Sequence, residues 1–232
     1  GWDFSSGRVL VFCDTSGHIL VMAAQKLIGV SVVVRHLRRL FLFFILINPI
    51  VVTTFSASAA DSSNEQKECR GDCCFSDVVE VGGESLSRRG VATFRYWGLK
   101  VYSAALYVPS GSLSRKEVER DTKKKLILCY HRSISTDRFI ENSEKMLRNN
   151  PAFTEKHLEP ELKQITDAYI AADEGDTYSI TFDPPSGEMQ LSFNERQLLK
   201  ITNRDFARAY FGIWISKYSV GERFTDELMG ER

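Results

Sequence analysis

Residues 90–109 read GVATFRYWGLKVYSAALYVP, and this stretch decides the fold because it is rich in the aromatic and β-branched residues that favour strands. Gly98 divides the stretch into two halves. In the second half both alternating sets of side chains are apolar apart from Ser103, which predicts a central strand covered on two faces. Pro109 then ends the run with turn chemistry. The stretch therefore predicts two adjacent strands, or one long bent strand.

The rest of the chain alternates between strand-like and helix-like segments. Short segments in which apolar and polar residues alternate predict strands, and apolar residues at helical spacing predict helices. The predicted helices begin at capping residues, and one of them has a proline in its first turn. Strands, then two helices, then strands and a last helix are typical of an α+β fold with helices packed on one face of a largely antiparallel sheet. The predicted strands are 78–81, 126–130, 176–182, 188–193 and 197–201, and the predicted helices run from Ser135 or Thr136 to about 149, through Pro160 to Tyr169, and from an Asn203 cap to Trp214, with a short surface crossing at 112–121.

The composition indicates one globular domain with additional segments, since 43% of the 232 residues are hydrophobic and 26% are charged. The formal net charge is zero. This argues against a nucleic-acid-binding protein, which needs a concentrated positive field along the phosphate backbone. The basic clusters are short, so we expect them in a targeting segment and in solvated turns. These clusters are Arg38-Arg39, Arg88-Arg89 and Lys123-Lys124-Lys125.

The N-terminal part has the pattern of a secretory signal peptide. Arg35, His36, Arg38 and Arg39 form a basic region, residues 40–47 form an unbroken apolar run, and residues 57–60 supply small side chains for a cleavage site. The apolar character resumes at residues 50–52, so a membrane anchor is the alternative. The run is nevertheless shorter than the roughly 20 residues that a helix needs to span a bilayer. We therefore expect cleavage and a periplasmic or secreted protein, with membrane contact only through an uncleaved signal segment.

These patterns divide the chain into four parts. Residues 1–21 do not fit a mature secreted domain, and Met22 is a plausible start, so we interpret 1–21 as an upstream, non-native extension. The predicted parts are an extension at 1–21, a signal peptide at 22–60, a polar, cysteine-containing leader at 61–77 and the folded domain at 78–232.

Four cysteines remain beyond the signal segment, and an oxidising compartment favours disulfides between them. Adjacent Cys73 and Cys74 can bridge each other only with strain, which favours Cys69 with either of them, or a bond to Cys129. The pairing stays open. A metal site is the alternative for this cluster, but no histidine lies at the spacing of a tetrahedral site. Because the leader 61–77 is poor in large apolar residues, we expect its cysteines to tether it outside the core.

Three stretches carry a resemblance to a known family and follow its order and spacing. They are the strand pair Gly90–Arg95 and Lys100–Tyr107, the turn Asp173–Asp176, and the helix Asp205–Trp214 followed by Leu228–Gly230. The strand pair has the pattern Gly-x-x-x-[Phe/Leu]-Arg and Lys-Val-Tyr-x-Ala-x-Leu-Tyr. Over roughly residues 78–230 the chain resembles the chalcone isomerase-like domain of secreted bacterial proteins. This resemblance implies the chalcone isomerase fold.

The resemblance also implies a ligand site. Arg89 and Tyr102 are similar to the arginine and tyrosine with which fatty-acid-binding members of the fold hold a carboxylate at the mouth of an apolar pocket. Arg95 is a rival candidate because it lies inside the matched motif. Asn142 matches the asparagine of true chalcone isomerases, but their threonine is replaced by Tyr102 and their tyrosine position falls near Ser135. Catalysis of that kind needs all donors together, so we expect no catalytic residue.

Other catalytic motifs are missing. The sequence has no Gly-rich phosphate loop, nucleophile elbow or His-Glu zinc motif, and we expect neither cofactor nor metal. His131 and His157 are isolated in sequence, which favours structural roles. The leading hypothesis is a secreted or periplasmic, non-catalytic binder of a small amphipathic ligand such as a fatty acid. The alternatives are an intramolecular lyase or isomerase acting on a phenolic or enone, chalcone-like substrate, and a pocketless envelope protein that binds a partner.

Overall fold

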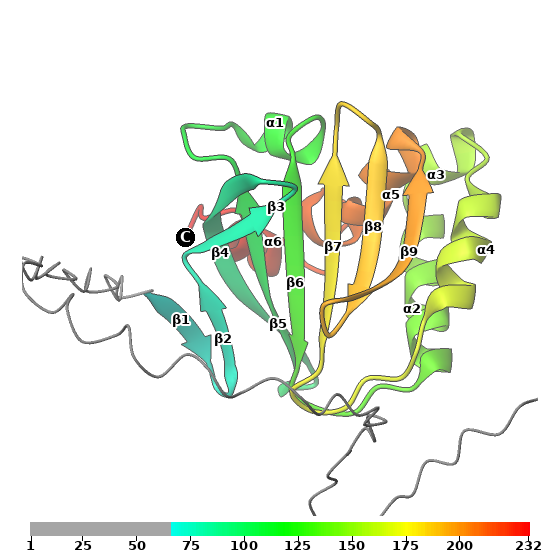
Figure 1. The fold of residues 1–232 in the computed structure, drawn as a ribbon. Helices are drawn as coiled ribbons and strands as arrows, with labels where there is room; N and C mark the ends of the chain where they lie inside the picture. The colour runs from blue at the N-terminus through cyan, green and yellow to red at the C-terminus, as the bar shows by residue number, and fades with distance from the viewer. Residues whose placement is uncertain (1–65) are drawn as a thin grey trace, which may run out of the picture. The chain divides into compact units, whose positions relative to one another are not determined.

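The computed structural model describes residues 66–232, which form two antiparallel sheets and six helices (Figure 1). The elements in chain order are β1 (Lys67–Arg70), β2 (Cys73–Ser76), β3 (Val78–Val81), β4 (Glu84–Tyr96), β5 (Leu99–Val108), α1 (Arg115–Glu119), β6 (Lys124–Tyr130), α2 (Thr136–Arg148), α3 (Pro151–Glu155), α4 (Glu159–Ala168), β7 (Thr177–Asp183), β8 (Glu188–Phe193), β9 (Arg196–Thr202), α5 (Arg204–Ile215) and α6 (Glu222–Leu228). Strands β3 to β9 form one sheet in chain order, and β1 pairs with β2. The predicted α+β class with a largely antiparallel sheet is confirmed.

Residues 90–109 form most of the hairpin of β4 and β5. Tyr96 and Leu99 are paired residues, so the turn consists of Trp97 and Gly98, which both have positive φ angles, 52° and 79°. Two positive φ angles give a turn whose twist matches that of the flanking strands. Strand β5 also pairs with β6, and its last seven residues are buried. The sequence thus correctly predicts two adjacent strands, the second of them central.

All six helices bury side chains against the same face of the seven-stranded sheet, which we call the helix-covered face. Helix α5 is buried along most of its length, and the side chain of its predicted cap, Asn203, accepts hydrogen bonds from the backbone N–H groups of Asp205 and Phe206, both at 3.1 Å. Satisfying these otherwise unpaired donors allows the helix to begin inside the protein. Representative core residues, one from each helix, are Val118, Leu147, Phe153, Leu162, Phe211 and Leu228.

The opposite face of the sheet carries a smaller core, to which the β1–β2 hairpin contributes. Cys73 and Phe75 from β2 are buried together with Ala105 and Tyr107 from β5. The expectation that segment 61–77 lies outside the core is therefore wrong for these two residues. Strand β5 is apolar on both faces, so the face opposite the helices must also be shielded from water. The side chains of Cys73 and Phe75 provide part of this shielding.

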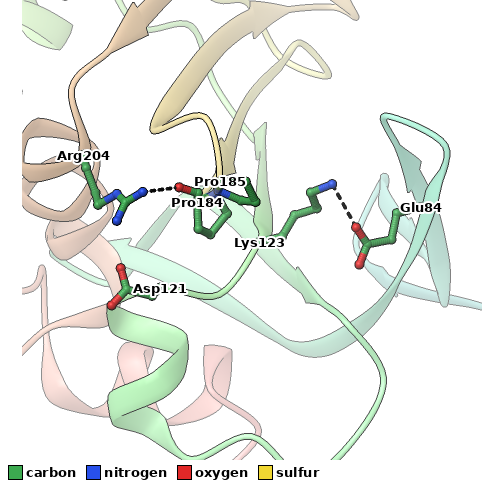
Figure 2. A pocket seen from close by; sticks show the side chains of 6 residues that line it. All are labelled: Glu84, Asp121, Lys123, Pro184, Pro185 and Arg204. Carbon is green, nitrogen blue, oxygen red and sulfur yellow. Dashed lines mark hydrogen bonds and ion pairs between the residues drawn. The ribbon is translucent and has the colours of Figure 1, made fainter.

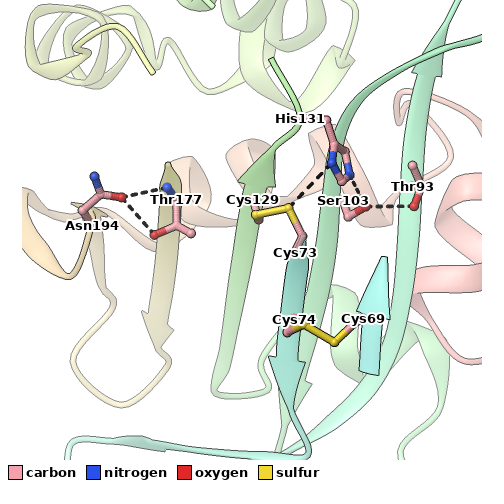
Figure 3. The surroundings of a disulfide bond; sticks show 9 residues. All are labelled: Cys69, Cys73, Cys74, Thr93, Ser103, Cys129, His131, Thr177 and Asn194. Atoms are coloured by element: carbon pink, nitrogen blue, oxygen red, sulfur yellow. Dashed lines mark hydrogen bonds between the residues drawn. A yellow bond between two sulfur atoms is a disulfide. The ribbon is translucent and has the colours of Figure 1, made fainter. Parts of the chain in front are cut away.

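The two disulfides join this hairpin internally and to the sheet. Cys69 bonds to Cys74 across β1 and β2, and we call this the intra-hairpin disulfide. Cys73 bonds to Cys129 on β6, 56 residues away in sequence (Figure 3). The structure thereby chooses among the pairings that the sequence leaves open, because side chains of neighbouring strand residues point to opposite faces and Cys73 and Cys74 face different partners.

Lys124 contradicts the expectation that the cluster of residues 123–125 forms a solvated turn. Its side chain is fully buried, and Nζ donates hydrogen bonds to the backbone oxygens of Val118 at 2.5 Å and Arg120 at 3.4 Å. Nζ also lies 5.2 Å and 5.4 Å from the ring centroids of Phe182 and Phe211. Strand β6 begins at Lys124, so strand alternation directs this side chain to the helix-covered face.

The predicted extension at 1–21 and signal peptide at 22–60 lie outside the described residues. Within 66–232, no helix is both long enough and apolar enough to cross a membrane.

Candidate functional site

Tyr102, the central residue of the predicted site, lies on β5 and points into the helix-covered face. Only 8% of it is exposed, and its hydroxyl oxygen accepts a hydrogen bond from Nε1 of Trp214 at 3.2 Å. Phe94 stacks on its ring at 5.2 Å between centroids, and Phe224 of α6 meets it edge-on at 5.8 Å. Burial raises the pKa of Tyr102 far above its usual value, although the bond from Trp214 opposes this. Tyr102 is therefore a neutral phenol at physiological pH.

Four more tyrosines share this interior with Tyr102, and we call the five the tyrosine cluster. The hydroxyls of Tyr169 and Tyr210 lie 2.7 Å apart. The hydroxyl of Tyr178 donates to the backbone oxygen of Ile170 at 2.7 Å and accepts from its N–H at 2.9 Å. Burial raises the pKa of every member, to about 12 for Tyr178. The cluster consists of Tyr102, Tyr130, Tyr169, Tyr178 and Tyr210.

Tyr130 is the member of the cluster whose hydroxyl is not engaged. Only 6% of the residue is exposed, yet no residue in 66–232 forms a hydrogen bond with its hydroxyl. Its ring centroid is 5.9 Å from that of Tyr102, and the hydroxyl proton of Tyr102 likewise has no acceptor among these residues. Among the described residues, Nε of Arg208 is the one fully buried side-chain nitrogen or oxygen without a partner, so the Tyr130 hydroxyl lies at the solvent-accessible edge of the cluster. Two neighbouring phenol donors are thus available for an oxygen atom of a ligand.

Arg89 has a different partner. Its Nε donates to the backbone oxygen of Met229 at 2.8 Å, just after α6. On β4, the residue paired with Tyr102 is Phe94, five positions beyond Arg89. At about 3.3 Å per residue, Arg89 and Tyr102 are separated by roughly 16 Å along the strands. The structure does not bring the predicted arginine and tyrosine together as a clamp.

The other two predicted residues also lie apart from Tyr102. Arg95 is exposed near the β4–β5 turn, where its Nη1 donates to the backbone oxygen of Gly98 at 3.3 Å. Asn142 is exposed on α2 and donates from Nδ2 to the backbone oxygen of Arg138 at 2.8 Å, within the same helix. Of the four predicted site residues, Tyr102 is the one that faces the tyrosine cluster.

Sequence reasoning missed the other members of the cluster because each fits an ordinary core position. Tyr130 ends the apolar run of β6, and Tyr178 alternates with buried residues along β7. Tyr169 follows α4 as its C-cap, and Tyr210 lies on the apolar side of α5. The eight tyrosines in the sequence are a compositional signal, but only packing shows that five of them meet.

Two open hollows lie among the described residues, each with charged side chains in its lining, and neither lies in the tyrosine cluster. One, with a volume of about 470 Å³, is lined by Lys123, Glu84 and Arg204 among others (Figure 2). Its charged groups already have partners, since Lys123 Nζ lies 2.8 Å from Glu84 and Arg204 donates to the backbone oxygen of Pro184 at 2.6 Å. The second, of about 500 Å³, faces polar side chains of β7 and β8. Neither hollow matches an apolar ligand.

A chain of polar side chains crosses the opposite face of the sheet beside the disulfide (Figure 3). Ser103 Oγ lies 2.8 Å from His131 Nε2 and 2.9 Å from Thr93 Oγ1, and His131 Nδ1 lies 3.9 Å from Cys73 Sγ. A serine and a histidine at this distance are typical of a nucleophile and its base. Ser103, however, has no exposed surface, so no substrate can reach it. Its contacts explain instead how a central strand tolerates a serine, because its hydroxyl is satisfied.

Comparisons with known proteins agree with this architecture. The family described as chalcone isomerase-like matches residues 69–230. Among solved structures, a fatty-acid binding protein of Arabidopsis thaliana is similar, with 13% sequence identity, a TM-score of 0.55 and coverage of 72% of this chain and 97% of that chain. No match was found among curated proteins. Since the family match spans most of the sequence and the sheet and helices follow the expected fold, the chain belongs to the chalcone isomerase-like family.

Proposed function

We propose that the protein is a non-catalytic binder of a small amphipathic carboxylic acid, such as a fatty acid. The carboxylate would accept hydrogen bonds from the hydroxyls of Tyr102 and Tyr130, and the tail would lie among the aromatic side chains of the helix-covered face. The observation that carries this proposal is the pair of neighbouring, largely buried tyrosines, Tyr102 and Tyr130, whose hydroxyl protons have no acceptor among residues 66–232. Hydrogen bonds to a charged acceptor are stronger than those between neutral groups. The similarity to a fatty-acid binding protein supports the same class of ligand.

Two observations favour binding over catalysis. The raised pKa values keep these phenols neutral, so they donate hydrogen bonds but do not act as bases near neutral pH. Arg89 and Asn142, the residues matched to chalcone isomerases, are engaged with backbone oxygens of Met229 and Arg138. A preorganised set of donors around one reacting atom is therefore missing from the described residues.

Entry of a ligand requires the aromatic packing around Tyr102 to open. Phe94 and Phe224 contact its ring, and Phe224 belongs to α6, a helix of seven residues whose N-cap, Gly221, provides no side-chain hydrogen bond. A short helix of this kind is held mainly by its packing. We propose that α6 moves to admit the ligand. The disulfides support the further proposal that the protein works in an oxidising compartment, in the periplasm or outside the cell.

The test compares laurate binding by the wild-type protein and Tyr130→Phe, measured by calorimetric titration. Because a hydrogen bond to a charged group contributes about 1.5–3 kcal/mol, we expect the variant to bind laurate at least about tenfold more weakly. Its thermal stability should not fall, because the lost hydroxyl has no partner in residues 66–232. Tyr218→Phe, outside the cluster, is the matched control and should bind like the wild type.

Methyl laurate separates the two parts of the proposal. It keeps the tail but has a neutral ester carbonyl in place of the carboxylate, which accepts a weaker hydrogen bond, so Tyr130→Phe should weaken its binding less than that of laurate. Equal binding of laurate by both proteins would show that Tyr130 does not hold the carboxylate. If the wild-type protein binds neither compound, the ligand-binding proposal fails, and the pocketless interaction protein becomes the better account.

A further inference from the structure

The turn between β4 and β5 (Figure 1) lies within residues 95–100, Arg-Tyr-Trp-Gly-Leu-Lys, which we call the aromatic tip because large apolar side chains are exposed there. Within 66–232, four large hydrophobic residues are exposed, and three of them lie in the aromatic tip. Tyr96 is 64% exposed, Trp97 88% and Leu99 54%. Scattered apolar residues are normal on a protein surface, whereas a contiguous group of them marks an interaction site.

Trp97 is not required by the turn that it occupies. Its φ of 52° is in the left-handed region, where Asn, Asp or Gly is preferred at the first position of a two-residue hairpin turn. The one aromatic contact recorded for its ring is with Tyr96, with centroids 6.2 Å apart. A bulky side chain in this conformation therefore costs stability without packing into a core. Neither the turn nor the core accounts for a tryptophan at this position.

The charges of the aromatic tip have one sign. Arg95 and Lys100 are paired residues of the hairpin, and like charges directly opposite one another repel. Neither forms a salt bridge with any residue in 66–232. Asp72 and Glu174 act on nearby His131, as do Arg95 and Lys100, so the positive field is partly balanced at this end of the sheet. The aromatic tip thus combines exposed aromatic groups with two cations that form no salt bridge within residues 66–232.

A membrane surface matches this combination. Trp and Tyr concentrate at the interface between hydrocarbon and headgroups, where one part of the ring is in an apolar environment and the other is wet, and basic residues add attraction to anionic headgroups. A stable protein complex needs about 800 Å² from each partner. The three apolar side chains of the tip can supply at most roughly 500 Å². We infer that the aromatic tip inserts into the headgroup region of an anionic lipid membrane.

This membrane contact is independent of the signal segment and of the proposed ligand site. The test is co-sedimentation of the full chain with vesicles of phosphatidylcholine containing about 30 mol% phosphatidylglycerol, since anionic lipid supplies the electrostatic attraction. The key variant is Trp97→Asn. Asparagine tolerates the left-handed conformation, so this variant should unfold at a higher temperature than the wild type. It should nevertheless bind vesicles at least tenfold more weakly, which separates loss of binding from loss of folding.

Two further variants test whether vesicle binding is specific to the aromatic tip and how much its two basic residues contribute. Val78→Thr removes an exposed apolar side chain elsewhere and should bind vesicles like the wild type. Neutralising Arg95 and Lys100 to Gln should weaken binding by at most roughly 30-fold, and less at high salt, because each basic residue near an anionic surface adds a modest attraction. Residues 1–65 are present in every protein compared and contribute equally to all of them.

Fluorescence quenching by brominated phosphatidylcholine locates the indole directly. Quenching of the wild-type protein in the same vesicles should exceed that of Trp97→Phe, because only the wild type places Trp97 at the acyl boundary. The inference is overturned if Trp97→Asn binds vesicles as tightly as the wild type, or if Trp97 is not quenched. It is also overturned if the wild type self-associates without vesicles and Trp97→Asn abolishes this, which would assign the aromatic tip to a second copy of the chain.

Discussion

Lys124→Met is expected to remove a pH dependence from the stability of this protein. The ammonium group of Lys124 is fully buried between α1 and the rings of Phe182 and Phe211. Burial lowers its pKa from 10.5 to about 7, while Asp121 opposes the shift and Arg208 adds to it. An unfolded chain restores the ordinary lysine pKa. The folded and unfolded states therefore differ in bound protons between pH 7 and pH 10.5.

Whether the free energy of unfolding rises or falls with pH depends on which state binds the proton. In this window the unfolded chain is protonated at residue 124 and the folded protein is not, so the free energy of unfolding rises with pH. Below pH 7 both states are protonated, and the full cost of the buried charge is present. Between about pH 6.5 and about pH 9.5 the two pKa values give a rise of about 3 kcal/mol from this group alone. Methionine has no proton to exchange, so Lys124→Met lacks this rise.

Urea unfolding followed by tryptophan fluorescence at several pH values measures the effect. The quantity to compare is the free energy of unfolding of the wild type minus that of Lys124→Met. This difference should increase by about 3 kcal/mol between about pH 6.5 and about pH 9.5. Loss of the hydrogen bonds to Val118 and Arg120 shifts this difference by about 1–3 kcal/mol at every pH and does not alter its slope.

Lys123→Met is the matched control. The hydrogen bond from Lys123 to Glu84, followed by that to Asp183, raises the pKa of Lys123, so this side chain stays charged across the whole window. The difference between wild type and Lys123→Met should be flat with pH. A flat difference for Lys124→Met as well would refute the reasoning, because it would show that the buried ammonium keeps an ordinary pKa.

Four other variants test the packing of the two faces by chemical unfolding. Ser103→Ala leaves His131 without its hydroxyl partner and should cost about 1–3 kcal/mol; a cost near zero would mean that another group satisfies the histidine. Replacing both cysteines of the Cys73–Cys129 disulfide by serine should cost about 4 kcal/mol, against about 2 kcal/mol for the intra-hairpin disulfide, since the closed loops span 56 and 5 residues; equal costs would contradict this order. Gly90→Ala places a Cβ within 3.0 Å of the backbone at the C-terminal end of α6 and should destabilise by at least roughly 1–3 kcal/mol, and unchanged stability would show that α6 moves away freely.

The candidate site was only partly predictable. The resemblance led to Tyr102, whose side chain points to the interior, but the partner predicted for it, Arg89, lies at the other end of the strands. A separation of 13 residues across a hairpin does not define a distance unless the turn and any bulge are known. Here a register irregularity between Arg88 and Gly90 includes Arg89 itself. The role of Tyr130 could not be predicted, because it depends on which hydroxyls around it are already paired.

The sequence by itself determined most of the main sheet and helices α2, α4 and α5 in their order, whereas β1, β2, α3 and α6 were not predicted. Alternation predicted the strands, capping residues such as Asn203 predicted helix starts, and turn residues predicted antiparallel neighbours, since all of these depend on contacts within a few residues. Only the tertiary structure decided the disulfide pairing, the burial of Lys124, the cover that Phe75 provides and the meeting of five tyrosines. Each of these depends on residues that are far apart in sequence and on the faces that they present, and a local pattern carries no information about such partners.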